Sequence, residues 1–319
     1  MVRLNPDDIN TKAGKKLKYR KKVQLQAEDL VFCLNSLQEI REQVQKRLVG
    51  QKEMLDVLFL GLLTGGHVLL QGLPGLGKST AIQSFCETLH AEVGQVQRTG
   101  EFIGNQVMVI DELDQCTPDF RRALLTAMQE RIVVIEEEVY YLDQPFLVYA
   151  TMNPDLLSPS GQVERKLSPA EFDRFLLFYE VPFPSASEEE SILKLDTTAQ
   201  LFQKSLPKLL GNGEILQMQR LCSAITVNDD LVKSIVRIAQ KTRDPAFREE
   251  MGIRSPGISP RSSLYLAKAC KAHAFLQNQT QASFEDLLSV GKFILRHRLV
   301  FETEPSCWQE FLIHAAEQQ

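Results

Sequence analysis

The chain lacks several features that mark membrane, secreted and metal-binding proteins. No apolar run approaches the ~20 residues that a membrane helix needs, and residues 1–7 contain no apolar core of a secretory signal. The six cysteines are scattered without a C-x-x-C pair, and the five histidines form no metal-ligand pattern. These absences favour a cytoplasmic protein with reduced thiols and no membrane contact.

The remaining composition is that of an ordinary globular protein. The chain has 319 residues, 44% hydrophobic and 24% charged, enough for one large α/β domain and a smaller second one. The net charge of −5 is uneven, because residues 1–22 carry a net of +6 and leave −11 on the rest. Such a basic arm is either a solvated tail or a segment that binds nucleic acid or an acidic partner.

The most informative segment fits the pattern G-x-x-x-x-G-K-[S/T] of a phosphate-binding loop. Its glycines allow backbone N–H groups to turn toward phosphate oxygens. A strand predicted at residues 67–71 enters the loop, and a helix predicted at 79–89 points its N-terminal dipole at the anion. The candidate nucleotide-binding residues here are Gly72, Pro74, Gly75, Leu76, Gly77, Lys78, Ser79 and Thr80. Lys78 would reach the β- and γ-phosphates, and the Ser79 hydroxyl would ligate Mg²⁺.

Strand and helix patterns alternate around this loop. Strands are predicted at residues 67–71, 93–97, 107–110, 146–150 and 175–179, with a hairpin at 131–142. Helices are predicted at 26–48, 54–63, 79–89 and 119–129. The alternation predicts a doubly wound α/β fold with a five-stranded parallel sheet, whose ligand lies at the carboxyl ends of the strands.

Beyond Pro182 and Pro184 the pattern becomes helical. Helices are predicted at residues 188–201, 213–222, 229–243, 261–277 and 284–298. The expected organisation is a basic arm at 1–24, a nucleotide-binding core at 25–184, a helical domain at 185–300 and a C-terminal tail at 301–319. Trp308, in that tail, is expected to be a packing residue.

Polar residues follow two of the predicted core strands. Asp111 and Glu112 end the strand 107–110, and hydrolysis of a Mg²⁺–nucleotide needs one carboxylate for the metal and another to polarise water. Asn153 follows the strand 146–150 and could hydrogen-bond the attacking water or the γ-phosphate. Each signal is weak alone, because many strands end in acids and Asn before Pro154 is a common turn.

Two arginines are candidates for stabilising charge on a transferring phosphoryl group. Arg174 precedes the last core strand, and Arg261 lies in the first turn of a predicted helix that Ser259 and Pro260 begin. Taken singly, either arginine could instead form a surface ion pair.

The order of these motifs resembles the MoxR family of AAA+ ATPases. The resemblance covers about residues 40–300 and rests on these segments: Val49-Gly50-Gln51, Gly65-Gly66-His67, the phosphate loop, and residues 123–131, 144–154, 171–175, 242–244, 257–261 and 295–298. It implies an AAA+ P-loop core followed by an all-helical lid. It also implies ATP hydrolysis in an oligomeric ring, expected to be a hexamer, with a von Willebrand factor A-domain partner.

The resemblance also implies roles for individual residues. Lys78 and Ser79 would form the Walker A pair, and Asp111 and Glu112 the Walker B pair, with Asp111 holding Mg²⁺ through water. Asn153 would be sensor 1, Arg174 an arginine finger for the neighbouring subunit, and Arg261 a sensor 2 contacting the γ-phosphate from the lid. Val49, Gly50 and Gln51 would lie near the adenine. The hairpin 131–142 would face the central pore.

One segment departs from the family pattern. MoxR proteins usually carry an insertion in the second helix, whereas here residues 99–106 alone separate Arg98 from Val107. The leading hypothesis is a chaperone-like ATPase that remodels or matures a partner. A nucleotide-gated scaffold and a DNA-directed motor remain alternatives, although the acidic body disfavours nucleic acid. A P-loop kinase or GTPase would not explain Asn153, Arg174 and the helical domain together.

Overall fold

The computed structural model describes residues 27–91, 93–95, 102–154, 156–157, 163–164, 167–194 and 205–317. The predicted basic arm lies outside these residues, as do residues 99–101 of the short segment before Val107. Within the described residues, no helix is both long and apolar enough to cross a membrane.

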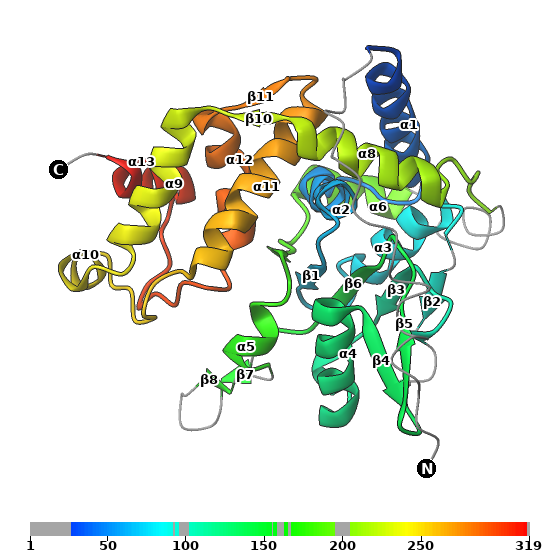
Figure 1. The fold of residues 1–319 in the computed structure, drawn as a ribbon, viewed down its shortest axis with the longest axis horizontal. Coiled ribbons are helices and arrows are strands. Elements are labelled where there is room, and N and C mark those ends of the chain that lie inside the picture. Colours follow the sequence, from blue (N-terminus) through cyan, green and yellow to red (C-terminus); the bar gives the residue numbers. More distant parts are fainter. Residues whose placement is uncertain are drawn as a thin grey trace, which may run out of the picture.

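A five-stranded parallel sheet forms the centre of the first domain, as predicted (Figure 1). Its strand order is β2-β3-β6-β1-β9. The strands are β1 (Val68–Gln71), β2 (Val93–Gln95), β3 (Val107–Ile110), β6 (Leu147–Met152) and β9 (Leu177–Glu180). Because all five run in one direction, the sheet has a carboxyl edge and an amino edge with different loops.

Helices cover both faces of the sheet, because alternate residues of each strand point to opposite sides. Residues such as Val68 and Tyr149 pack into one core with α1 (Ala27–Gln45), α2 (Lys52–Thr64) and α3 (Lys78–Glu87). Residues such as Leu69 and Val148 pack into a second core with α4 (Pro118–Glu130). The predicted hairpin is formed by β4 (Ile132–Ile135) and β5 (Glu138–Tyr141).

The second domain is helical, as predicted, and gathers on one side of the sheet (Figure 1). Its long helices contact one another and α2, so its core is continuous with one face of the sheet. The helices after the sheet are α6 (Ala186–Lys194), α8 (Asn212–Ala224), α9 (Asp229–Lys241), α10 (Pro245–Glu250), α11 (Pro260–Leu276), α12 (Phe284–Leu295) and α13 (Trp308–Ala316).

The stretch predicted as a C-terminal tail is part of this helical body. Helix α13 contacts α9 and α12, and its Phe311 and Leu312 are buried. Trp308 packs edge-on against Phe301 and Phe311, so its predicted packing role holds.

Several short elements escaped the sequence patterns because they are too short to show a period. They are η2 (Leu113–Gln115), α5 (Pro169–Phe172), α10 and the two-residue strands β7 (Leu156–Leu157), β8 (Val163–Glu164), β10 (Thr226–Val227) and β11 (Gln281–Ala282). Of these, η2 lies shortly after β3, and α5 lies shortly before β9.

Candidate functional site

The phosphate loop leaves the carboxyl end of β1 and passes directly into α3. Gly75 and Gly77 have φ angles of +88° and +79°, a region that favours glycine. Gly77 is the residue before α3, and the first N–H groups of a helix have no partner within the helix and are suited to bind an anion. The backbone therefore has the shape of an anion cradle.

Lys78 is the first residue of α3 and lies folded back over this loop. It is buried, and its Nζ donates to the carbonyl oxygens of Gly72, at 2.5 Å, and Leu73, at 2.9 Å. Burial lowers the pKa of Lys78, while the nearby carboxylates of Asp111, Asp114 and Glu112 act to raise it. The ammonium thus lies between the cradle and a group of acids.

Ser79 and Asp111, the two predicted magnesium ligands, are in direct contact. Ser79 Oγ donates to Asp111 Oδ1 at 2.6 Å, and Thr151 Oγ1 donates to the same oxygen at 3.0 Å. Thr151 Oγ1 also accepts from the backbone N–H of Glu112 at 3.0 Å. One buried threonine on β6 therefore fixes both acids at the end of β3.

Glu112 and Asn153 also lie together, as the sequence predicted for the ends of adjacent strands. Asn153 Nδ2 lies 3.4 Å from Glu112 Oε1, within hydrogen-bonding reach. The Asn153 backbone N–H donates to Asp114 Oδ1 at 3.3 Å. Glu112 has a φ of +53°, a conformation that costs energy for a residue with a side chain. The turn into η2 therefore brings the Glu112 side chain to Asn153.

The segment predicted to lie near the adenine borders the phosphate loop. A Cβ on Gly77 would lie 3.3 Å from Leu48 Cδ1, so the residue before Val49 touches the loop. Gln51 Nε2 donates to the carbonyl of Pro182 at 3.3 Å. Gly50 has a φ of +65°, and a Cβ there would overlap the Glu188 carboxylate. The connection between α1 and α2 is thus held beside the carboxyl edge.

These residues fit a magnesium–nucleotide. A hydroxyl and a carboxylate are hard oxygen ligands, and Mg²⁺ usually takes only one or two of them beside phosphates and water. The described residues contain no cluster of three or more His, Cys, Asp or Glu that would hold a metal without such a substrate. The cradle supplies donors for phosphate, and the acids supply the metal's ligands.

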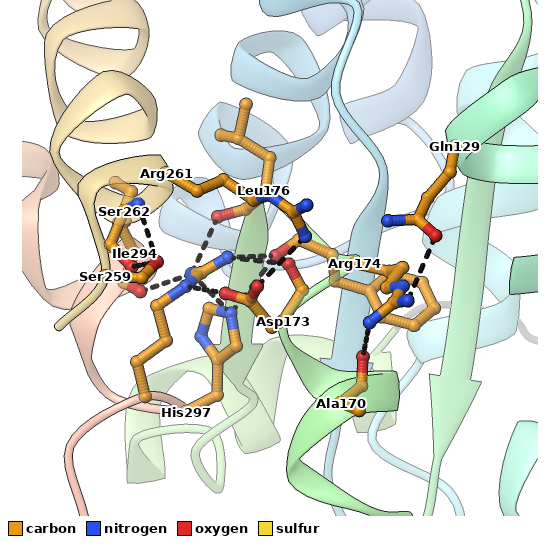
Figure 2. A network of polar contacts seen from close by, with 12 residues as sticks. Gln129, Ala170, Asp173, Arg174, Leu176, Ser259, Arg261, Ser262, Ile294 and His297 are labelled. Atoms are coloured by element: carbon orange, nitrogen blue, oxygen red, sulfur yellow. Dashed lines mark hydrogen bonds and ion pairs between the residues drawn. The ribbon is translucent and has the colours of Figure 1, made fainter. Parts of the chain in front are cut away.

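Arg174 lies at the opposite, amino edge of the sheet, just before β9. Its Nη1 donates to the carbonyl of Ala170 at 2.7 Å, and its Nη2 donates to Gln129 Oε1 at 3.0 Å (Figure 2). It lines a cavity of about 270 Å³ together with Gly66 and His67, which precede β1. The predicted finger therefore belongs to the edge that the phosphate loop does not occupy.

Arg261 lies beside Arg174, away from the phosphate loop of its own chain. Ser259 caps α11 and Pro260 begins it, as predicted, but Arg261 Nη1 pairs with Asp173 Oδ2 at 3.2 Å (Figure 2). Because β1 spans four residues, the loop that follows it is roughly 13 Å from the residues that precede it. The expectation that Arg261 reaches the γ-phosphate from the lid of the same chain is not met in this structure.

Sequence reasoning missed three residues that organise the two edges. Thr151 lies in the predicted strand's continuation and has no charge to attract notice. Asp173 and Gln129 are ordinary polar residues whose partners, Arg261 and Arg174, are distant in sequence. The signal for Asp173 was its place next to Arg174 in the family-like segment 171–175.

Three family models match successive parts of the chain. A MoxR domain of the MoxR-vWA-beta-propeller ternary systems matches residues 35–96. The ATPase family associated with various cellular activities (AAA) matches residues 102–177, and an AAA lid domain matches 254–310. The first two include the phosphate loop and the acids, and the third includes Arg261.

Individual proteins are similar to this chain over most of its length. "Chaperone MoxR1" of Mycobacterium tuberculosis is 28% identical over 305 residues, covering 86% of this chain and 78% of that protein. "Uncharacterized protein YeaC" of Bacillus subtilis is 28% identical over 289 residues, covering 82% and 86%. A crystal structure from Cytophaga hutchinsonii has a TM-score of 0.76 and 26% identity, covering 90% of this chain and 95% of its own. In both sequence and fold, this chain is therefore similar to the MoxR family of AAA+ ATPases.

Proposed function

We propose that this chain hydrolyses ATP with Mg²⁺ in a ring of identical subunits, at sites that two neighbours share. The observation that supports this most directly is the separation of the candidate residues onto two edges of one sheet. The phosphate loop, Asp111, Glu112 and Asn153 occupy the carboxyl edge, and Arg174 and Arg261 occupy the amino edge. A head-to-tail ring brings these unlike edges of adjacent subunits together.

The carboxyl edge would bind the nucleotide and prepare the water. Val49, Gly50 and Gln51 border the adenine, the loop N–H groups and Lys78 hold the β- and γ-phosphates, and Ser79 and Asp111 hold Mg²⁺, with Asp111 acting through water. Bound there, the metal would neutralise phosphate charge. Glu112 takes the proton of the attacking water, and Asn153 orients that water or the γ-phosphate.

The amino edge would complete the neighbour's site. Arg174 and Arg261 lie close together in one chain, so both would approach the same γ-phosphate across the subunit boundary. Guanidinium groups stabilise the charge that spreads over the phosphoryl oxygens in the transition state. Arg261 keeps its proposed role as a sensor of the γ-phosphate, but acts on the neighbour's nucleotide.

The cycle would drive chaperone-like remodelling or maturation of another protein. A relative carries the name "Chaperone MoxR1", and the matching family model is described from systems that contain a vWA protein. On this basis we propose a hexameric ring with a von Willebrand factor A-domain partner. The free cysteines, four of them buried, support a cytoplasmic location.

A DNA-directed motor is the less favoured candidate. The hairpin β4–β5, expected to face the pore, turns through Glu136 and Glu137 and continues with Glu138. Adjacent carboxylates repel a phosphate backbone. A polypeptide client is therefore the better match to this surface.

ATP turnover of the purified chain tests the proposal. Wild type should release phosphate in the presence of Mg²⁺, and Glu112→Gln should bind ATP but turn it over at least 100-fold more slowly. Glu249→Gln, the same change at an exposed site on α10, is the matched control. Turnover of Glu112→Gln equal to wild type would contradict the proposal. Slow wild-type turnover unaffected by a partner would favour the nucleotide-gated scaffold.

A further inference from the structure

Arg298 is a buried charge at the junction between the helical domain and the amino edge. It follows α12, and its side chain is 5% exposed. Burial lowers its pKa, while the carboxylate of Asp173 acts to raise it. A charge in such a place is tolerated only when its hydrogen bonds are satisfied.

Every nitrogen of this guanidinium has an acceptor. Nε donates to Asp173 Oδ1 at 2.9 Å, and Nη2 donates to the carbonyls of Asp173, at 3.1 Å, and Phe175, at 2.9 Å. Nη1 donates to the carbonyl of Ile294 at 2.5 Å and lies 2.6 Å from His297 Nε2, which itself lies 3.1 Å from the Phe175 carbonyl. Burial and the Arg298 charge lower the pKa of His297 well below its ordinary value, so its ring is neutral. The side chain therefore joins α12 to the backbone that leads into β9.

These bonds place Arg261, which is exposed, and Arg174, which is half-buried. Arg298 holds Asp173 through Oδ1, which leaves Oδ2 for Arg261 at 3.2 Å. Asp173 is the residue before Arg174, whose own side chain is held on the other side by Ala170 and Gln129 (Figure 2). One carboxylate thus connects Arg261 of the helical domain with the backbone that carries Arg174.

The remaining supports of this segment act on α5 rather than on the arginines. Ser168 and Glu171 form a capping box at the start of α5, and Glu171 Oε1 pairs with Arg121 Nε at 2.9 Å. These contacts hold the helix, but they do not reach Arg261. Asp173 forms ion pairs with both Arg298 and Arg261.

We propose that Arg298 is a positioning residue that fixes Asp173, and through it sets Arg261 and Arg174 for the ATP bound by the adjacent subunit. The inference rests on the proposed function, since it assumes a site shared between subunits. Arg298 does not touch the nucleotide, but it determines whether Arg261 and Arg174 are both positioned at the ATP of the adjacent subunit. A misplacement of about 1 Å at such groups can cost about 100-fold in rate.

The first test separates positioning from mere packing. Arg298→Lys keeps the charge but loses the forked geometry, and Asp173→Asn keeps the shape but loses the charge. Both should lower kcat about 10-fold or more with KM for ATP unchanged, and the double variant should be no worse than the poorer single variant. Arg254→Lys, whose partner Glu302 makes an exposed pair on the same domain, should behave as wild type. Wild-type kcat in both single variants, or KM and kcat impaired together with thermal stability, would overturn the proposal.

Mixed assemblies supply the second test. Glu112→Gln subunits cannot hydrolyse their own ATP but carry an intact amino edge, so they should restore turnover when mixed with Arg298→Lys subunits. A mixture of Arg174→Ala and Glu112→Gln is the reference. Recovery in the reference alone would overturn the role of Arg298, whereas no recovery in the reference would overturn the shared site itself. If Arg298→Lys does not fold, Asp173→Asn, half-buried and of equal size, takes its place in the mixture.

Discussion

The two edges of the sheet differ in how their polar groups are assembled. At the carboxyl edge, Ser79 and Thr151 both donate to Asp111, and all three residues belong to the first domain. At the amino edge, Asp173 belongs to the first domain, while Arg261 and Arg298 belong to the helical domain. One edge is built within a domain, and the other requires two domains to be docked.

Under the proposed function, neither edge is sufficient by itself. The carboxyl edge has a cradle, candidate metal ligands and a base, but no described arginine of its own chain contacts them. The amino edge has two arginines that line one cavity, the exposed Arg261 and the half-buried Arg174. The predictions below test whether the edges have separable functions, in order of decreasing expected effect.

Loss of Arg174 should affect turnover without affecting binding. Arg174→Ala is expected to lower kcat about 10³-fold, because an arginine finger stabilises charge that develops only in the transition state. Affinity for ATP, measured by titration calorimetry, should stay within about twofold of wild type. Arg254→Lys is the control, and a large loss of affinity in Arg174→Ala would place that residue in its own chain's site.

Loss of Lys78 should lower both the affinity for ATP and the turnover. Lys78→Met removes a buried cation from the cradle, and we expect ATP binding and turnover each to fall about 100-fold. The same calorimetry and phosphate-release assay apply. ATP binding that survives this change would show that the cradle is not the nucleotide site.

Acid should destabilise the amino edge through His67. This buried ring accepts from the backbone N–H of Val148 through Nδ1, at 3.1 Å, and its Nε2 lies 3.3 Å from the Met128 carbonyl. Burial lowers its pKa from 6.5 to about 4, so the unfolded chain binds the proton more readily than the folded one. The contribution of neutral His67 to the free energy of unfolding is complete above pH 6.5. It is lost as pH falls toward 4, by about 3 kcal/mol at most.

Urea unfolding at several pH values measures this loss. His67→Gln removes the titrating group and keeps hydrogen-bonding capacity, so its stability should change less between pH 6.5 and 4 than that of wild type. Carboxylates titrate in both proteins and cancel in the difference. If the free energy of unfolding depends on pH in the same way in both proteins, His67 is not the group responsible for the acid destabilisation.

Thr151 should make the smallest difference. Thr151→Val keeps the shape but removes the hydroxyl that fixes Asp111 and the Glu112 backbone, and we expect kcat to fall about 10-fold. Thr126→Val, an exposed hydroxyl on α4 that bonds its own helix, is the control. An unchanged kcat would mean that the acids are positioned without Thr151.

Sequence patterns predicted the sheet and most long helices because those elements carry their own periodicity. The run at residues 107–110 is apolar throughout, as expected for a parallel strand buried on both faces. Ser259 and Pro260 indicate the start of α11. The contact between Glu112 and Asn153 also follows from sequence, because these residues follow the neighbouring strands β3 and β6, and Ser79 and Asp111 were both predicted to hold the same metal. Their catalytic roles stay predictions.

The amino edge could not be derived in the same way. Arg261 and Arg298 are far from Asp173 in sequence, and no local pattern encodes which domain face docks on which edge. The packing of α13 was missed for a related reason. Its burial depends on α9 and α12 rather than on a strong pattern of its own.

The central claim is that the two edges belong to one site when they come from different subunits. Turnover of Arg174→Ala and Glu112→Gln, each inactive alone, should be measured after mixing them in equal amounts. In a randomly mixed ring, roughly a quarter of the boundaries join an intact carboxyl edge to an intact amino edge, so about a quarter of wild-type turnover should return. A mixture as inactive as its two components, despite mixed rings by mass, would contradict the account.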